Sequence, residues 1–487
     1  MQTVSCPSCG APVEFRSHAS VMAVCGYCNT TVLKEADAVK DIGKMSAVLE
    51  DYSPIQIGTS GVAGGRGFNV AGRIQLRYDA GMWNEWFLVF DDGATGWLGD
   101  SSGLYTLTME RPAGGVLPAF DAIAPGRLYQ IDGATFTASE KRTARCTGGQ
   151  GELPFRVGEG WEARVADFRS GAQFVTLDYS DGDAPVVYNG TAVTLEELKC
   201  QLLRDDEAIK SSAGRYRGKL DALDCPSCGT QIKYLPGVTT SLVCPACATQ
   251  LDAAGPKAQV VAAGEKLEAV RTTLMLGAEG KINGQDYRVI GAMVRADDEG
   301  SEWTEYLLYN TRNAFFWLVE TDDGWWRANV MHEWPAWNGI GTRTVSLKNA
   351  SFDKLYDYPA TVKWAAGAFN WRVSIGDLVQ VSEYEHAPTR LAAELTQNEL
   401  TWSSSTRVAF DQVKAWFGIG VRPEARRSGS APVRTDTIVK GFLWAILALN
   451  FIPVLFNFGG SIIYPILGAL AIYLPSQFMD IGGKGDE

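Results

Sequence analysis

Apolar and polar residues alternate along most of the chain between residues 55 and 194, and again between residues 271 and 417. A period of two is typical of strands that bury one face, because neighbouring side chains point to opposite sides of a sheet. Turn dipeptides interrupt the first stretch at Asp92-Gly93, Asp132-Gly133, Asp181-Gly182 and Asn189-Gly190. Such dipeptides favour tight hairpins, so the pattern predicts two antiparallel β domains.

Helical spacing is limited to short segments. An apolar stripe follows the first β domain and consists of Leu195, Leu198, Leu202 and Ile209. Thr194 precedes this stripe and Glu197 lies three residues further on, which is the pattern of a capping box. We therefore expect a helix over 195–212. The charged segment 35–52 indicates a second short helix or a linker.

The chain is internally duplicated. Residues 57–74 align with residues 276–293 at an offset of 219 residues. The glycine-rich stretch 61–72 resembles a phosphate-binding loop, and its counterpart in the second copy helps to interpret it. Its partner has lost most of these glycines and carries Asn283-Gly284 instead. Both copies are therefore interpreted as a strand, a turn and a strand.

Cysteines form the pattern C-x2-C-x15-C-x2-C twice, and these eight residues are Cys6, Cys9, Cys25, Cys28, Cys225, Cys228, Cys244 and Cys247. Two close pairs with a hairpin-sized insert can close a tetrahedral Zn²⁺ site, so the spacing predicts two zinc ribbons. Four thiolates fill the coordination sphere, which indicates structural ions. Two such pairs at ribbon spacing favour a metal over a thiol–disulfide role.

No charged residue lies between Lys440 and Asp480, a run of 39 residues. About 20 residues cross a bilayer as a helix, so the run predicts a hairpin of two spans over 441–478. The alternative is a buried core hairpin of a soluble domain. Basic residues precede the run at Arg422, Arg426, Arg427, Arg434 and Lys440. By the positive-inside rule we expect this side, and therefore the ribbons and β domains, to face the cytoplasm.

Composition narrows the candidate chemistry. The net charge of −12 disfavours binding of the ribbons to nucleic acid, whose phosphates need a basic surface. The sequence contains no recognised catalytic motif, so we expect no enzymatic activity. Aromatic residues beside carboxylates could bind a cation, although large aromatics on strands also fill β cores. The candidate ligand-binding residues are Trp83, Glu85, Trp86, Trp303, Glu305 and Tyr306.

The chain resembles an uncharacterised bacterial family of zinc-ribbon membrane proteins built from a tandem domain of unknown function. The resemblance rests on CPSCG in the ribbon, on the segment 57–74, on WNEWFLVFDDG (83–93) and on FNWRVSIGD (369–377). It implies a gene neighbourhood of spermidine-synthase-like enzymes and phage-shock-type membrane-stress proteins. It therefore implies the bacterial inner membrane as the location and makes a polyamine a reasonable ligand.

Together these patterns predict a mainly β protein of two tandem repeats, each a zinc ribbon plus an antiparallel β domain, followed by a transmembrane helical hairpin. The expected parts are ribbon 1 (1–34), a helical linker (35–54), β domain 1 with a C-terminal helix (55–214), ribbon 2 (222–252), a linker (253–270), β domain 2 (271–417), a basic linker (418–440), the hairpin (441–478) and a tail (479–487).

The expected function is a membrane-anchored scaffold or ligand sensor with two zinc ions, membrane lipid and a protein partner. The alternatives are a nucleic-acid-binding ribbon protein and a subunit of an enzyme that acts on a cationic small molecule.

Overall fold

The computed structural model describes residues 2–15, 20–34, 39–44, 53–205, 222–234, 241–252, 259–262, 270–419 and 466–467, apart from residues 21, 29, 79–80, 102, 156, 158–159 and 311–313 within those ranges. Strands make up most of the described residues, as the alternating pattern predicts.

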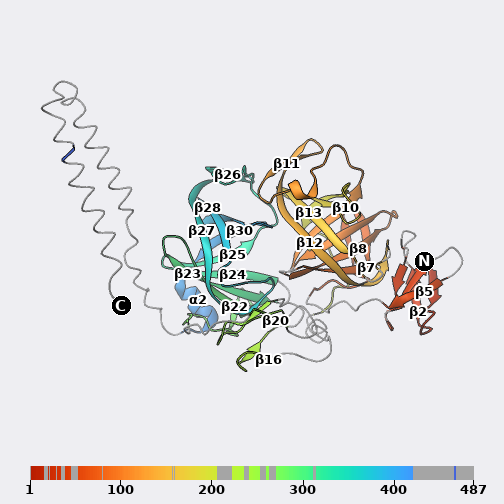
Figure 1. Ribbon diagram of the computed structural model, residues 1–487, viewed down its shortest axis with the longest axis horizontal. Helices are drawn as coiled ribbons and strands as arrows, with labels where there is room; N and C mark the ends of the chain where they lie inside the picture. Colours follow the sequence, from red (N-terminus) through yellow and green to blue (C-terminus); the bar gives the residue numbers. More distant parts are fainter. Residues whose placement is uncertain are drawn as a thin grey trace, which may run out of the picture. The chain divides into compact units, whose positions relative to one another are not determined.

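Two runs of strands follow the two halves of the chain (Figure 1). The first run is β1 (Gln2–Ser5), β2 (Pro12–Phe15), β3 (Met22–Val24), β4 (Thr30–Lys34), β5 (Val39–Lys44), β6 (Ser60–Ala63), β7 (Arg66–Tyr78), β8 (Gly81–Phe90), β9 (Thr95–Ser101), β10 (Leu104–Arg111), β11 (Leu128–Ile131), β12 (Ala134–Leu153), β13 (Glu162–Ser170), β14 (Gln173–Asp178) and β15 (Val186–Val193), with the short 3₁₀ helix η1 (Phe120–Ala122) before β11. The second run is β16 (Ala222–Asp224), β17 (Gln231–Lys233), β18 (Ser241–Val243), β19 (Gln250–Asp252), β20 (Gln259–Ala262), β21 (Glu279–Ile282), β22 (Gln285–Ala296), β23 (Glu302–Asn310), β24 (Ala314–Thr321), β25 (Gly324–Val330), β26 (Thr344–Leu347), β27 (Ala350–Phe369), β28 (Leu378–His386), β29 (Thr389–Leu395) and β30 (Leu400–Val408), followed by helix α2 (Phe410–Phe417).

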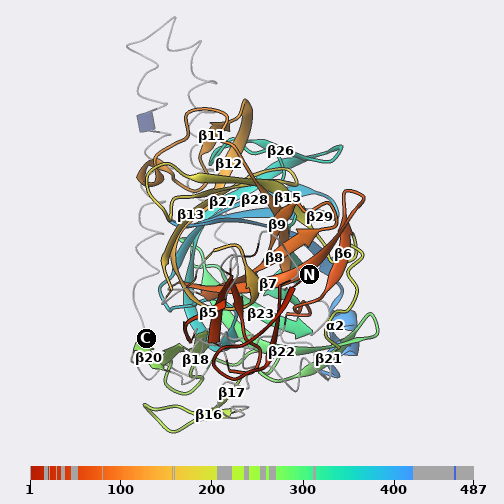
Figure 2. The same ribbon diagram turned by 90° about the vertical axis from the view of Figure 1, so that its right-hand side faces the viewer.

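Both halves form the same antiparallel sheet. Hydrogen-bonded strands follow in the order β5-β4-β3-β12-β13-β14-β15-β10-β9-β8-β7-β6 in the first half and β20-β19-β18-β27-β28-β29-β30-β25-β24-β23-β22-β21 in the second. Because β7 also pairs with β12, and β22 with β27, eight strands of each sheet close on themselves. Figure 2 shows β7, β8 and β9 side by side in the first sheet. The predicted sequence duplication is thus a duplication of the fold.

Neighbouring residues of one strand enter different hydrophobic clusters. On β8, Trp86 and Leu88 pack with Phe68 and Tyr105, whereas Phe87 packs with the opposite cluster around Ile74. This two-sided burial explains why both strand faces are rich in large apolar residues. Most of the tryptophans that the sequence places on strands fill these clusters.

The predicted helix over 195–212 is wrong for its described part, residues 195–205, because residues 195–199 form turns and Gln201 forms an isolated β-bridge with Ser60. The capping box itself is present, since Thr194 N–H donates to Glu197 Oε2 (2.8 Å) and Glu197 N–H donates to Thr194 Oγ1 (3.1 Å). The backbone then leaves the helical conformation at Lys199, where φ is +48°. The Leu198 carbonyl accepts a hydrogen bond from Val62 N–H (2.8 Å) of β6, so docking onto the sheet replaces a further helical turn.

Three smaller expectations also change. The segment 35–52 contains strand β5 where we expected a helix or linker, because β5 pairs with β4. Asn189-Gly190 lies inside β15 and makes no turn. Its glycine is needed because a Cβ there would lie 1.7 Å from the Leu107 carbonyl oxygen of β10. Helix α2 was not predicted, and its N-cap, Ala409, offers no side-chain hydrogen bond that would mark the start.

Among the described residues, no helix is both long enough and apolar enough to cross a bilayer. The predicted hairpin 441–478 lies outside the described residues except for Ile466 and Leu467.

Candidate metal centres and buried carboxylates

The first four-cysteine group is built by two tight turns, one after β1 and one after β3. In the first turn, Gly10 N–H donates to the Cys6 carbonyl (2.8 Å), and Gly10 has φ +78°, which favours glycine. The turns bring Cys6 Sγ to 3.7 Å from Cys28 Sγ and Cys9 Sγ to 3.6 Å from Cys25 Sγ. All four sulfurs lie within 4.8 Å of one another.

The second group repeats this geometry after β16 and β18. Cys225 Sγ lies 3.7 Å from Cys247 Sγ, and Cys228 Sγ lies 3.7 Å from Cys244 Sγ. Disulfide sulfurs would be about 2.05 Å apart. Sulfurs at about 2.3 Å from one metal in a tetrahedron are separated by about 3.8 Å. The eight predicted cysteines therefore form two groups that could each hold a metal ion.

The thiols within a group differ in acidity. A hydrogen bond with Thr230 lowers the pKa of Cys228 to about 6, whereas burial raises the pKa of Cys244 to about 12. In the first group a hydrogen bond with Thr30 lowers the pKa of Cys28 to about 6. Each group therefore offers one readily formed thiolate to an incoming cation, whose charge then favours deprotonation of the others.

The cysteine-bearing segments are continuous with the β domains. Strand β3 pairs with β12 through Met22 and Leu153, and β18 pairs with β27 in the second repeat. Met22 and Leu33 share a hydrophobic cluster with Ile74 of the closed sheet. In the second repeat, Cys225 and Cys244 themselves belong to the cluster around Phe369 and Val373. A metal ion bound by these cysteines would therefore stabilise the edge and the core of the β domain as well as the cysteine-bearing turns.

Carboxylates, most of them buried, occupy matching strand positions in the two repeats. Glu85 on β8, Asp167 on β13 and Asp178 on β14 correspond, by strand register, to Glu305 on β23, Glu383 on β28 and Glu394 on β29. Burial raises the pKa of each of the five carboxyl groups Glu85, Asp167, Asp178, Glu305 and Glu383. Both sheets thus carry acidic groups on one largely apolar face.

In the second repeat an arginine sits between two of these carboxylates. The Arg295 side chain is 5% exposed, and its Nη1 lies 3.1 Å from both Glu305 Oε1 and Glu394 Oε1. Trp303 Nε1 also donates to Glu305 Oε1 at 2.7 Å. The guanidinium neutralises a cluster that would otherwise bury uncompensated charge.

The first repeat has no such cation at the same position, because its register places Leu76 where the second repeat has Arg295. Glu85 accepts a hydrogen bond from Trp83 Nε1 at 3.0 Å. Burial, with smaller contributions from the charges of Asp178 and Asp167, raises the pKa of Glu85 to about 7. The replacement of arginine by leucine is visible in the aligned repeats, but only the strand pairing shows that it faces the carboxylates.

The six predicted ligand-binding residues do not form one group. Trp83 and Glu85 lie together, as do Trp303 and Glu305. Trp86 is 1% exposed and packs in the opposite cluster, with the Arg73 guanidinium 4.8 Å from its ring centroid. Tyr306 is likewise fully buried in its own cluster, where its hydroxyl donates to Glu320 Oε2 at 2.8 Å. A ligand-binding role for the tryptophan–glutamate pairs stays a prediction.

Comparison with known proteins identifies the β domains. A family model described as a domain of unknown function, DUF4178, matches residues 56–195 and again residues 275–410. These ranges coincide with the closed sheets of the two repeats. Searches of curated proteins and of solved structures found no match to this chain. Because the two matched ranges cover more than half of the chain, the protein belongs to the DUF4178 family and contains its domain twice.

Proposed function

We propose that the protein is a non-enzymatic, membrane-anchored scaffold or ligand sensor, with two structural Zn²⁺ ions that hold each ribbon on its β domain. The observation that carries this proposal is the hydrogen bonding of the cysteine-bearing hairpins to the sheets, through β3–β12 and β18–β27. A ribbon joined in this way stiffens the edge of a larger domain, which suits a protein that presents a surface to a partner.

Zinc is the proposed metal because four thiolates in a tetrahedron are its usual structural ligand set. A site closed by four protein ligands leaves no open position for water or substrate. The proposal therefore assigns the ions to folding and no step of a reaction to them.

The proposed location is the inner face of a bacterial cytoplasmic membrane, with the hairpin 441–478 as the anchor. Support comes from the uncharged run in the sequence and from the basic residues before it. The resemblance stated above suggests envelope stress or polyamine metabolism as the context, with a protein partner and membrane lipid as binding partners.

Metal content of the full-length chain, purified in detergent, tests the structural-zinc proposal. We expect two zinc ions per chain, and one per chain when Cys25 and Cys28 are both changed to serine. A content near zero or one in the unaltered chain contradicts the proposal. Fractionation tests the anchor, because a full-length chain that stays in the supernatant without detergent excludes it.

A cationic small molecule is a second candidate ligand, and one observation favours it. The second repeat places the Arg295 guanidinium against Glu305 and Glu394, whereas the first repeat keeps the matching carboxylates Glu85 and Asp178 and has leucine in place of the arginine. Spermidine should therefore raise the Tm of the full chain, and Glu85→Gln should abolish that rise. An equal rise in this variant, or no rise in the unaltered chain, rejects the candidate.

A further inference from the structure

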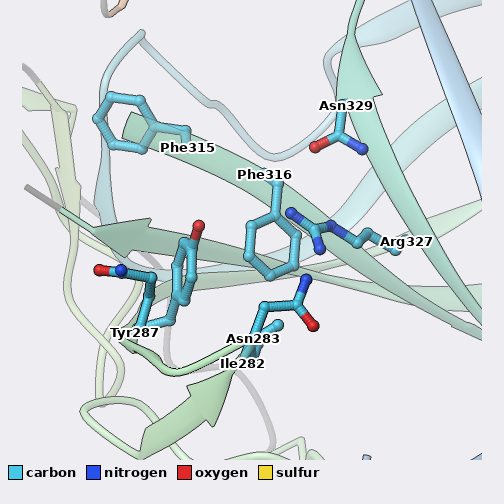
Figure 3. A pocket seen from close by; sticks show the side chains of 8 residues that line it. Ile282, Asn283, Tyr287, Phe315, Phe316, Arg327 and Asn329 are labelled. Carbon is cyan, nitrogen blue, oxygen red and sulfur yellow. The ribbon is translucent and has the colours of Figure 1, made fainter. Parts of the chain in front are cut away.

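A cavity of about 290 Å³ opens beside the hairpin β21–β22 of the second repeat (Figure 3). Its lining combines three aromatic rings, three carboxamides, one aliphatic side chain and one guanidinium. The lining residues are Ile282, Asn283, Gln285, Tyr287, Phe315, Phe316, Arg327 and Asn329. A space of this size matches the small end of ligand-binding pockets. The mixture of flat apolar walls and a few polar groups is typical of sites that orient small molecules.

Arg327 of β25 is held in place by aromatic packing. Its guanidinium carbon lies 4.3 Å from the centroid of the Phe316 ring, and Phe316 is 2% exposed. Phe316 is in turn fixed by Tyr287, with ring centroids 4.9 Å apart in an edge-to-face arrangement. In Figure 3 the guanidinium lies beside the Phe316 ring and near the Asn283 side chain. The positive charge is therefore positioned before any ligand arrives.

Within the described part of the chain, Arg327 has no carboxylate partner, and its buried Nε has no hydrogen-bond acceptor. Buried donors nearly always find an acceptor, and a guanidinium prefers a carboxylate or a phosphate. The carboxamides of Asn283, Gln285 and Asn329 are neutral and do not balance its charge. The cavity thus presents a fixed charge that the protein leaves uncompensated.

The first repeat shows how such an arginine is satisfied within the chain. Arg66 lies over the ring of Phe90 at 4.6 Å, and its Nη1 contacts Asp92 Oδ2 at 3.2 Å. In the second repeat, Leu318 of β24 pairs with Arg327 of β25. The corresponding pair in the first repeat is Leu98 of β9 with Leu107 of β10, so a leucine occupies the position of Arg327 there. Both repeats therefore stack an arginine on a phenylalanine in this region, and only the first supplies a carboxylate to it.

We propose that the cavity of the second repeat binds a small planar carboxylic acid. Its carboxylate takes the role that Asp92 has for Arg66 and accepts hydrogen bonds from the Nη groups of Arg327. Its planar part lies against the aromatic wall, and the carboxamides hydrogen-bond to further polar substituents. A carboxylate can accept two parallel hydrogen bonds from the guanidinium, and its single negative charge equals the single positive charge of Arg327. This site uses none of the cysteines and goes beyond the function proposed above.

Benzoate and its neutral analogue benzamide are suitable probes, measured by NMR titration of the full-length chain in detergent. Charged hydrogen bonds contribute about 1.5–3 kcal/mol, so benzoate should bind about ten-fold or more tighter than benzamide. Arg327→Leu, which installs the residue of the first repeat, should weaken benzoate binding by a similar factor. Arg66→Leu is the matched control, because it removes the ring-stacked arginine of the other repeat, and it should leave the Kd unchanged.

A second variant keeps the proposal testable if Arg327→Leu fails to fold. Asn329→Asp places a carboxylate in the cavity, where it should pair with Arg327 and compete with benzoate, again raising the Kd about ten-fold or more. The proposal is overturned if benzoate does not bind the unaltered chain, if benzamide binds equally well, or if neither variant weakens binding.

Discussion

Replacing Arg295 with leucine, the residue at the matching position of the first repeat, should destabilise the second β domain by about 3–5 kcal/mol at pH 8. The guanidinium is buried and contacts two carboxylates at 3.1 Å. Among the described residues, its removal leaves the Trp303 indole as the one hydrogen-bond donor to Glu305, which lies on an apolar face. An unpaired buried charge lowers the free energy of unfolding by far more than an intact buried ion pair raises it.

The loss should also depend on pH, with a defined sign. Burial raises the pKa of Glu305, and the Arg295 charge opposes that rise, so the pKa increases further in the variant. A carboxyl with a raised pKa keeps its proton in the folded state at pH values where the unfolded chain has released it. Stability is therefore retained at acidic pH and lost as the pH rises, so the effect of Arg295→Leu should be much smaller at pH 5 than at pH 8.

Urea unfolding followed by tryptophan fluorescence measures this effect. Arg288→Leu is the matched control, because Arg288 pairs with Glu279 on the surface, with side chains 52% and 65% exposed, and should cost less than about 1 kcal/mol. Adding Glu305→Leu to Arg295→Leu should recover part of the stability. The reasoning fails if Arg295→Leu costs less than about 1 kcal/mol at pH 8, or if its cost is the same at both pH values.

Three further predictions concern other parts of the chain. Burial raises the pKa of Glu85 to about 7, so the stability of the folded chain should fall as the pH rises from about 4.5 through about 7. Glu85→Gln should flatten this part of a plot of Tm against pH, and an unchanged slope in the variant would contradict the prediction. Gly190→Ala should lower the Tm strongly because its Cβ would meet the Leu107 carbonyl, whereas Gly115→Ala, with open space around it, should be neutral; equal effects would refute the close approach. Chelation of metal, or Cys25→Ser, should lower the Tm of the first β domain and raise the rate of amide hydrogen exchange in β12, because β3 pairs with β12. An unchanged exchange rate in β12 would show that the ribbon and the β domain fold independently.

Much of the architecture could be predicted because it depends on local pattern. The alternating residues of β7 predict a strand whichever way the sheet closes, and Asp132-Gly133 makes a tight turn because both residues adopt positive φ. The cysteine spacing likewise limits each group to one compact turn geometry. The predicted helix after Thr194 failed for the opposite reason, since a capping signal was outweighed by hydrogen bonds to a distant strand.

The candidate sites likewise combine features that follow from local sequence with features that depend on the tertiary structure. The sequence alone determined the eight cysteines, the duplication and the strand-rich character, because each follows from spacing or periodicity along the chain. Only the tertiary structure decided that the ribbons continue the sheets, that Arg295 faces Glu305 and Glu394 while Leu76 takes its place in the first repeat, and that Arg327 meets the ring of Phe316 beside a cavity. These arrangements depend on strand register and on pairing between residues far apart in the chain, where a shift of one position would turn every side chain to the opposite face.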